Sequence, residues 1–258
     1  MRKLALTLSA LALTAAMASA EEIKVGVSVG EHAEIMEQVA KVAKDKGLDI
    51  DIVEFTDYVV PNQALNDGDL QANSFQHQPY LDNQIKDRGF DLVAIAKTIT
   101  TPMGVYSEKL KSLDELPEGG KVAIPNDPTN GGRALLLLQD KGLIKLAEGT
   151  GLSPTPLDVT ENAKNLKFLE LDAAQLPRSL ADADAAVINT NYALEAGLNP
   201  EKDAIAIENA ESPYANIIVV RSADKDAPWA KTLVESYHSD AVKKYIQDKY
   251  TGAVIPAW

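Results

Sequence analysis

Residues 121–138 of this chain, KVAIPNDPTNGGRALLLL, contain the pattern that decides the fold. Residues 122–124 are an apolar run, which is typical of a short buried strand. The prolines, asparagines, aspartate and glycines of residues 125–132 favour a loop, and the apolar run of residues 133–138 favours a helix. We therefore expect a strand, a loop and a helix in this order.

Arg133 is predicted to lie in the first turn of that helix, beside backbone N–H groups that have no partner within the helix. Free N–H groups, the helix dipole and a guanidinium group all favour a small anion such as a carboxylate. A second interpretation stays open at this point, in which Arg133 is a solvated or salt-bridged residue of the first turn. The segment alone does not choose between them.

Predicted strands and helices alternate on both sides of this segment. The predicted strands are residues 23–29, 48–55, 70–75, 91–97, 166–171, 185–188, 204–207 and 217–220. The predicted helices are residues 32–46, 60–66, 79–87, 229–237 and 239–248, and the SLDE string of residues 112–115 matches a capping box that begins a short helix. This alternation predicts an α/β protein whose mostly parallel sheets are covered on both faces.

The first residues have the composition of an export signal. Arg2 and Lys3 precede an apolar stretch that ends at Met17, and Ala-Ser-Ala at residues 18–20 provides a cleavage site before Glu21. The apolar stretch is too short to span a membrane. We therefore predict that residues 1–20 are a cleaved signal peptide and that the rest of the chain is exported and soluble.

Composition excludes several classes of partner. The 258 residues contain no cysteine, which excludes disulfides and lipid attachment through an N-terminal cysteine. The formal net charge of −13 argues against binding to nucleic acid or to an anionic membrane. From these features we expect a protein that binds no nucleic acid and is not lipid-anchored.

Residues that follow the predicted strands are candidates for a binding site, because ligands of open α/β sheets lie at the carboxyl ends of the strands. They are aromatic and amide-rich, and the set includes Tyr58, Phe75, Gln76, His77, Asn189, Asn191, Tyr192 and Asn216. The sequence contains no HExxH, CxxC or P-loop motif, and we predict no metal, no cofactor and no catalytic residue. One enzymatic alternative remains, with His77 or Asp127 as a general base.

Several strings of the chain resemble the MetQ/NlpA family, the periplasmic methionine-binding proteins of ABC importers. They are FTDYVVPNQAL, NSFQHQPYLD, VAIPNDPTNGGRALLLLQDKGLIKL, LDVTENAKNLKFLELDAAQLPRSL, AVINTNYA and SPYANIIVVR. The resemblance extends in order over essentially all of the chain after residue 20. Many family members carry a cysteine at the cleavage site, whereas Ala20 and Glu21 stand here.

The resemblance implies a two-lobed type II periplasmic-binding-protein fold with the ligand in the cleft between the lobes. Residues 21–102 and 216–258 would form lobe one, and residues 103–215 would form lobe two. The crossovers between the lobes would lie near residues 101–106 and 214–219.

The resemblance also assigns roles to residues. Arg133 matches the arginine that binds the ligand carboxylate, and a bidentate fork suits that task better than lysine. Asn189 and Asn216 match the asparagines that hydrogen-bond the amino-acid head group. An aromatic wall would surround the thioether, which makes favourable contacts with ring edges. Its members are Tyr58, Phe75, His77 and Tyr80.

The function implied by the resemblance is capture of methionine, most simply L-methionine, in the periplasm by a monomeric solute-binding protein. Its partner would be an ABC importer, a permease with its ATPase. Two alternatives remain open. The ligand could be a methionine-containing dipeptide or another small apolar amino acid, or the protein could be a periplasmic enzyme that acts on a small carboxylate.

Overall fold

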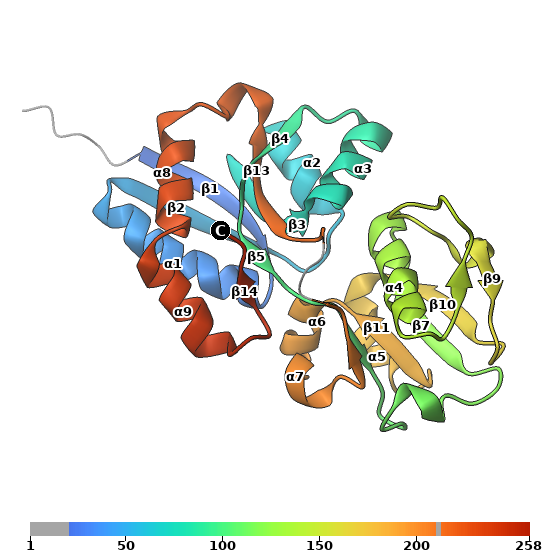
Figure 1. The fold of residues 1–258 in the computed structure, drawn as a ribbon. Coiled ribbons are helices and arrows are strands. Elements are labelled where there is room, and N and C mark those ends of the chain that lie inside the picture. The colour runs from blue at the N-terminus through green and yellow to red at the C-terminus, as the bar shows by residue number, and fades with distance from the viewer. Residues whose placement is uncertain (1–20, 210–212) are drawn as a thin grey trace, which may run out of the picture.

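The computed structural model of the chain describes residues 21–209 and 213–258 and shows two α/β lobes side by side (Figure 1). Each lobe is built around its own five-stranded sheet. The predicted signal peptide of residues 1–20 lies outside the described residues. This architecture confirms the predicted two-lobed α/β fold.

The sheet of the first lobe has the strand order β2-β1-β3-β13-β4. Its strands are β1 (Glu21–Ser28), β2 (Leu48–Phe55), β3 (Ala72–His77), β4 (Leu92–Lys97) and β13 (Asn216–Arg221). Strand β1 is parallel to β2 and β3, whereas β13 runs antiparallel to both of its neighbours. A strand from the end of the chain thus lies in the middle of a sheet formed by its beginning.

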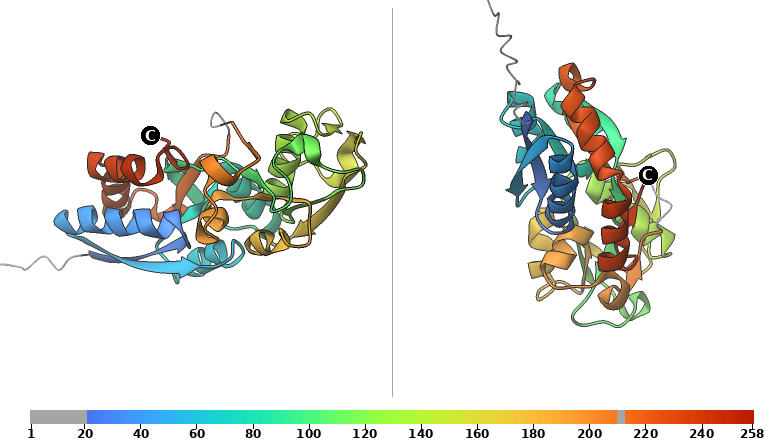
Figure 2. Two further views of the ribbon diagram at one scale, coloured as in Figure 1. Left: turned by 90° about the horizontal axis from the view of Figure 1, so that it is seen from below. Right: turned by 90° about the vertical axis from the view of Figure 1, so that its left-hand side faces the viewer.

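Helices cover both faces of this sheet. Helices α1 (Glu31–Asp45), α8 (Pro228–Tyr237) and α9 (Asp240–Tyr250) pack together on one face, as Figure 2 shows from two further sides. Helices α2 (Val60–Asp67) and α3 (Gln78–Arg88) cover the other face through a smaller apolar cluster. Alternate residues of the strands enter these two clusters, as the period of a strand requires.

The sheet of the second lobe has the order β10-β7-β11-β6-β12. Its strands are β6 (Gly104–Tyr106), β7 (Lys121–Pro125), β10 (Lys167–Leu171), β11 (Ala185–Ile188) and β12 (Ala206–Ile207). Helix α4 (Pro128–Asp140) packs on one face, and α5 (Leu176–Ser179) and α6 (Thr190–Glu195) pack on the other, with α7 (Pro200–Asp203) after them. A short hairpin of β8 (Lys145–Leu146) and β9 (Val159–Glu161) extends the lobe.

Two segments connect the lobes. The chain leaves the first lobe after β5 (Ile99–Thr100), which pairs with β14 (Ile255–Pro256), and enters the second sheet at β6. It returns between β12 and β13. Among the described residues, no helix combines the length and the apolar character that crossing a bilayer requires.

The helix that contains Arg133 begins earlier than predicted. Helix α4 starts at Pro128, and Asp127 caps it by accepting a hydrogen bond from the backbone N–H of Asn130 at 2.9 Å. Gly131 and Gly132 lie inside the helix for a packing reason. A Cβ at Gly131 would lie 2.7 Å from the oxygen of Pro125, and one at Gly132 would lie 2.7 Å from the oxygen of Leu152.

Two local predictions were therefore wrong. Arg133 does not lie in the first turn of a helix, because five residues of α4 precede it. The SLDE string forms a 3-10 turn (Leu113–Glu115) without a capping box. The side chain of Ser112 makes no cap hydrogen bond there, and Glu115 accepts instead from the backbone N–H of Lys111 at 2.8 Å.

Candidate ligand-binding site

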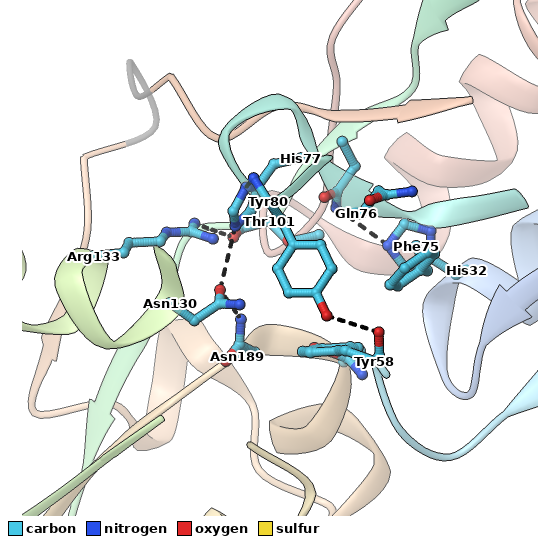
Figure 3. Close-up of a pocket in the computed structure, with 12 residues that line it drawn as sticks. His32, Tyr58, Phe75, Gln76, His77, Tyr80, Thr101, Asn130, Arg133 and Asn189 are labelled. Atoms are coloured by element: carbon cyan, nitrogen blue, oxygen red, sulfur yellow. Dashed lines mark hydrogen bonds between the residues drawn. The ribbon is translucent and has the colours of Figure 1, made fainter. Parts of the chain in front are cut away.

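A cavity lies between the lobes (Figure 3). The space in it that the centre of a water-sized sphere can occupy is about 20 Å³, so its walls lie close together. The residues that line it are His32, Tyr58, Phe75, Gln76, His77, Tyr80, Thr101, Asn130, Arg133, Asn189, Asn191 and Asn216. All seven residues that the sequence predicted for the site are in this set, so the fold brings them together.

The aromatic part of the lining comes from the first lobe. The ring of Phe75 lies 6.0 Å from those of Tyr58 and Tyr80, measured between centroids. The hydroxyl of Tyr80 donates to the backbone oxygen of Tyr58 at 2.8 Å, which fixes the two rings relative to each other (Figure 3). Tyr80 is only 5% exposed, so this ring serves the packing of the lobe as well as the cavity.

His77 occupies a structural position at the edge of the cavity. Its Nδ1 accepts a hydrogen bond from the backbone N–H of Tyr80 and so caps helix α3. Its Nε2 therefore carries the proton and donates to Oδ1 of Asn130 in the other lobe at 3.3 Å. Burial, and then the nearby Arg133, lower the pKa of His77 to about 3, so the ring is neutral at physiological pH.

A second histidine, which the sequence did not single out, lies beside Asn216. Asn216 begins β13 and is 5% exposed, and its Nδ2 lies 3.2 Å from Nε2 of His32. Burial lowers the pKa of His32 to about 4, so its Nε2 can accept from the amide. His32 thus orients the amide of Asn216 at the cavity.

Asn130 connects several parts of the cavity wall. Its Nδ2 donates to both carboxylate oxygens of Asp127, which turns its Oδ1 toward the other lobe. That oxygen accepts from Nδ2 of Asn189 at 2.9 Å as well as from His77. Within the described part of the chain, Oδ1 of Asn189 has no hydrogen-bond partner, so it is available to a donor in the cavity.

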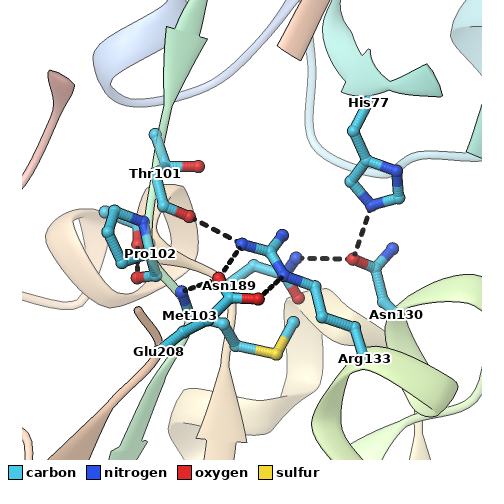
Figure 4. Close-up of polar contacts among 9 residues, drawn as sticks. His77, Thr101, Pro102, Met103, Asn130, Arg133, Asn189 and Glu208 are labelled. Atoms are coloured by element: carbon cyan, nitrogen blue, oxygen red, sulfur yellow. Dashed lines mark hydrogen bonds and ion pairs between the residues drawn. The ribbon is translucent and has the colours of Figure 1, made fainter. Parts of the chain in front are cut away.

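Arg133 is paired within the protein, as Figure 4 shows. Its Nε donates to Oε1 of Glu208 at 3.0 Å and its Nη2 donates to Oε2 at 2.5 Å. The same Nη2 donates to the backbone oxygen of Thr101 at 2.9 Å, and the guanidinium lies 4.5 Å from the ring centroid of Tyr214. These contacts agree with the second interpretation of the sequence, a salt-bridged arginine, and the role of Arg133 toward a carboxylate stays a prediction.

The lobes also touch directly beside the cavity. The hydroxyl of Tyr58 donates to Oδ1 of Asn191 at 2.5 Å, and the hydroxyl of Tyr192 donates to the backbone oxygen of Thr56 at 3.1 Å. The rings of Tyr58 and Tyr192 are 5.1 Å apart. Together with the bond from His77 to Asn130, these contacts hold the two lobes against each other around the cavity.

The sequence missed part of the lining. Gln76 and Asn191 were among the candidates that follow the predicted strands, but no role was assigned to them. Asn130 was not a candidate, although it lies in the same string as Arg133. Gln76 is held by its Nε2, which donates to Oδ1 of Asn62 at 2.6 Å. Thr101 and Glu208 carried no local pattern, because their contribution depends on the two connecting segments meeting at Arg133.

Relatives of known sequence and structure resemble the chain over most of its length. The family model described as NlpA lipoprotein matches residues 23–258. The D-methionine-binding lipoprotein MetQ of Escherichia coli (strain K12) is 56% identical over 239 residues, which are 92% of this chain and 88% of that protein.

Two solved structures share the fold. A nutrient binding protein from Burkholderia cenocepacia bound to methionine superposes with a TM-score of 0.90 at 56% identity, covering 92% of this chain and all (100%) of that one. An ABC transporter periplasmic substrate-binding protein from Coxiella burnetii has a TM-score of 0.88 at 48% identity, covering 91% of this chain and 100% of its own.

These relatives overturn one prediction, that the protein is not lipid-anchored. The family is described as lipoproteins, and the relatives of Escherichia coli and Vibrio cholerae carry that word in their names. The prediction rested on the absence of cysteine, which excludes only attachment through a thiol of this sequence. The prediction that the protein is not lipid-anchored is therefore wrong as a general statement.

The match to the family model and the identity to MetQ both extend over nearly all the described residues. The lining of the cavity lies within the matched range. The chain therefore belongs to the NlpA lipoprotein family.

Proposed function

We propose that this protein is a solute-binding protein that captures methionine and delivers it to an ABC importer, a permease with its ATPase. The observation that carries the proposal is the cavity between the lobes, which combines an arginine, several amides and an aromatic wall. These are the groups that bind a carboxylate, an ammonium and a thioether. A relative named for D-methionine binding and a related structure bound to methionine support this ligand.

Each part of methionine has a partner in this arrangement. The carboxylate would accept from Nη1 of Arg133, because Nε and Nη2 of the same side chain donate to Glu208. The ammonium would donate to the amide oxygens of Asn189 and Asn216, because Oδ1 of Asn189 has no partner among the described residues. The thioether would lie against the aromatic wall of Tyr58, Phe75, His77 and Tyr80, where each sulfur contact with a ring contributes roughly 0.3–1.5 kcal/mol.

The lobes would act as two bodies that close on the ligand. We take residues 21–102 and 216–258 as one body and residues 103–215 as the other. Tyr58, Phe75 and His77 belong to the first, and Arg133 and Asn189 to the second. A ligand that contacts both bodies interacts better with the closed form than with the open form, so binding shifts the population toward closure.

The enzymatic alternative has little support at this site. His77 uses both ring nitrogens in hydrogen bonds, and its lowered pKa of about 3 makes it a poor base at neutral pH. Asp127 caps helix α4 and accepts from both Thr129 and Asn130. We therefore propose binding without chemical conversion, by a monomeric protein that works in the periplasm.

Mass spectrometry and calorimetry test the ligand. Gently purified protein should release methionine when it is denatured, and stripped protein should bind methionine in calorimetry without turnover. L-methionine, D-methionine, leucine and a methionine dipeptide are compared on the same preparation, and we expect L-methionine to bind most tightly. Tightest binding of leucine or of the dipeptide would replace methionine as the ligand.

Small-angle scattering tests closure. Stripped protein should have a larger radius of gyration than the same protein with methionine. Its melting temperature should rise with ligand concentration, because binding to the folded form alone stabilises it. An unchanged radius together with an unchanged melting temperature would show that the chain is not a closing binding protein.

A further inference from the structure

Glu208 lies outside the cavity lining but contacts Arg133, the one arginine among the described lining residues. It follows β12 on the segment that returns to the first lobe, and its side chain is 12% exposed. Both of its carboxylate oxygens accept from Arg133, which is 3% exposed. Figure 4 shows that this pair faces Thr101 on one side and the cavity residues Asn130 and Asn189 on the other.

Glu208 balances the charge of the arginine in the cavity lining. Among the twelve residues that line it, Arg133 is the only one that is charged at neutral pH, because burial lowers the pKa of His32 to about 4 and that of His77 to about 3. The carboxylate of Glu208 balances that single positive charge. Two further carboxyl groups act on the lining residue Tyr58. Asp127 accepts from Thr129 and Asn130, and burial raises the pKa of Glu31 to about 8, which keeps it mostly neutral at neutral pH.

We propose that Glu208 is a specificity-determining residue that makes the cavity selective for a net-neutral, zwitterionic ligand. This inference rests on the proposed function, in which the ligand is an amino acid. An uncompensated guanidinium in a buried site would favour any small carboxylate, because charge interactions are strong where water is excluded. Paired with Glu208, Arg133 keeps hydrogen-bond donors for the ligand carboxylate but supplies no net charge.

When Glu208 balances Arg133, a ligand with a single negative charge gains no net electrostatic attraction over a zwitterion. It would bring a second carboxylate close to Glu208, and nothing in the lining would balance it. A zwitterion brings its own ammonium, which the amide oxygens of Asn189 and Asn216 can accept. The cavity therefore discriminates between an amino acid and the same carboxylate without an amino group, although the described lining residues include no carboxylate to bind an ammonium.

Glu208 also has a structural contact that the test must separate from this role. Its Oε2 accepts from the backbone N–H of Met103 at 3.2 Å, and its own N–H donates to the oxygen of Met103 at 2.9 Å. A purely structural residue would, when replaced, weaken all ligands alike. A charge-balancing residue changes the order of ligands that differ in charge.

The experiment is a charge series on stripped protein, measured by calorimetry at neutral pH. The ligands are methylthiobutyrate, which is methionine without its amino group, then L-methionine, and the cationic alcohol methioninol. The wild-type protein should bind methionine most tightly, and its affinities for the anion and the cation should differ by no more than about tenfold. An anion bound more than about a hundredfold better than the cation would show that Arg133 acts as an unbalanced charge, and would overturn the proposal.

Two variants sharpen the result. Glu208→Gln keeps the shape and an acceptor, and should raise the affinity for the anion relative to methionine by at least about tenfold while lowering that for the cation. Glu208→Asp keeps the charge and should leave the order unchanged. Equal weakening of all three ligands in Glu208→Gln overturns the charge role but leaves methionine capture intact. A wild-type protein that binds none of the three overturns the proposed function instead.

If Glu208→Gln does not fold, the wild-type charge series decides by itself, because its criterion needs no variant.

Discussion

The two walls of the cavity differ in how they are built. The wall from the first lobe contains an aromatic group that lies close together in the sequence, Tyr58, Phe75, His77 and Tyr80. The same lobe adds the polar residues His32, Gln76 and Asn216. The wall from the second lobe is polar, and Arg133 there depends on Thr101 and Glu208, which lie far from it in the sequence. Local packing therefore fixes one wall, and contacts between distant segments fix the other.

This difference predicts how each wall tolerates change. Tyr80 is held by Tyr58 and His77 within the same lobe, whereas Tyr58 and His77 also bond to Asn191 and Asn130 of the other lobe. The polar residues are held by one another, so replacing one of them leaves its partners with unsatisfied hydrogen bonds or charge. We expect the largest effects at the polar wall, and the predictions below are ordered accordingly.

Arg133→Ala should have the largest effect. It removes a charge-assisted partner of the ligand, and each such bond contributes roughly 1.5–3 kcal/mol, so methionine affinity should fall by more than about tenfold. The variant should also melt at lower temperature, because Glu208 loses its ion-pair partner. Calorimetry and thermal melting measure both effects, with Arg178→Ala on helix α5 as the control. Near-native affinity in Arg133→Ala would show that the polar wall does not bind the carboxylate.

Asn216→Ala should come next. It removes an amide that His32 orients at the cavity, and an unsatisfied polar group in a buried complex costs about 1–3 kcal/mol. We expect methionine to bind several-fold to a hundredfold more weakly, while the melting temperature without ligand changes little. A marked fall in the melting temperature without ligand would instead make Asn216 a structural residue of β13. Thr98→Val, beside the same strand but outside the lining, is the matched control.

Tyr58→Phe should have a smaller effect, and it tests a hydrogen bond between the two walls. The hydroxyl donates to Asn191 across the lobes, and a hydrogen bond of this kind contributes about 0.5–1.5 kcal/mol. Losing it should weaken methionine binding by a few-fold and reduce closure in small-angle scattering. Tyr80→Phe is the control, because its hydroxyl bonds within the first lobe. Equal effects of the two changes would mean that the contact between the lobes does not matter for closure.

The sequence predicted the fold wherever the pattern was local. Strand 48–55 was predicted with its observed bounds, because its alternation is uninterrupted. The start of α4 was missed because Gly131 and Gly132 resemble a loop, while their real cause is the close approach of Pro125 and Leu152. No local pattern could show that approach, because Leu152 comes from a different part of the lobe.

The site residues show the same difference between local patterns and contacts of distant segments. Residues after the strands were found because the carboxyl ends of strands meet at one edge of a sheet. Glu208 and Thr101 were missed because they matter only through the two connecting segments that meet at Arg133. The predicted role of each lining residue toward a ligand stays a prediction until the variants above are measured.

The smallest effect concerns pH and the two neutral histidines. Because the pKa values of His32 and His77 are lowered to about 4 and about 3, neither ring changes charge between pH 6 and pH 8. The two rings should therefore change methionine affinity by less than about twofold over this range. Because burial raises the pKa of the neighbouring Glu31 to about 8, the test is made on Glu31→Gln, and a steep fall in affinity between pH 8 and pH 6 in that variant would show that one of these rings becomes charged at the cavity.

Stability should respond below that range, with a definite sign. In the unfolded chain a histidine has its ordinary pKa of 6.5, whereas burial lowers the pKa of folded His32 to about 4. The unfolded state thus holds more protons between these values, so the free energy of unfolding falls as the pH drops from about 6.5 toward 4. Glu31 acts in the opposite direction, because burial raises its pKa from 4.5 to about 8 and it then stabilises the fold as the pH falls from 8 toward 4.5.

The two contributions separate when wild type is compared with His32→Gln, since Glu31 is common to both. The stability of wild type relative to this variant should decrease steadily from pH 7 to pH 4.5, by roughly 1.4 kcal/mol for each pH unit below the unfolded pKa. Denaturant unfolding at several pH values measures this difference. A constant difference would mean that His32 is protonated in the folded protein as readily as in the unfolded chain, and that the amide of Asn216 is oriented by something other than a neutral ring.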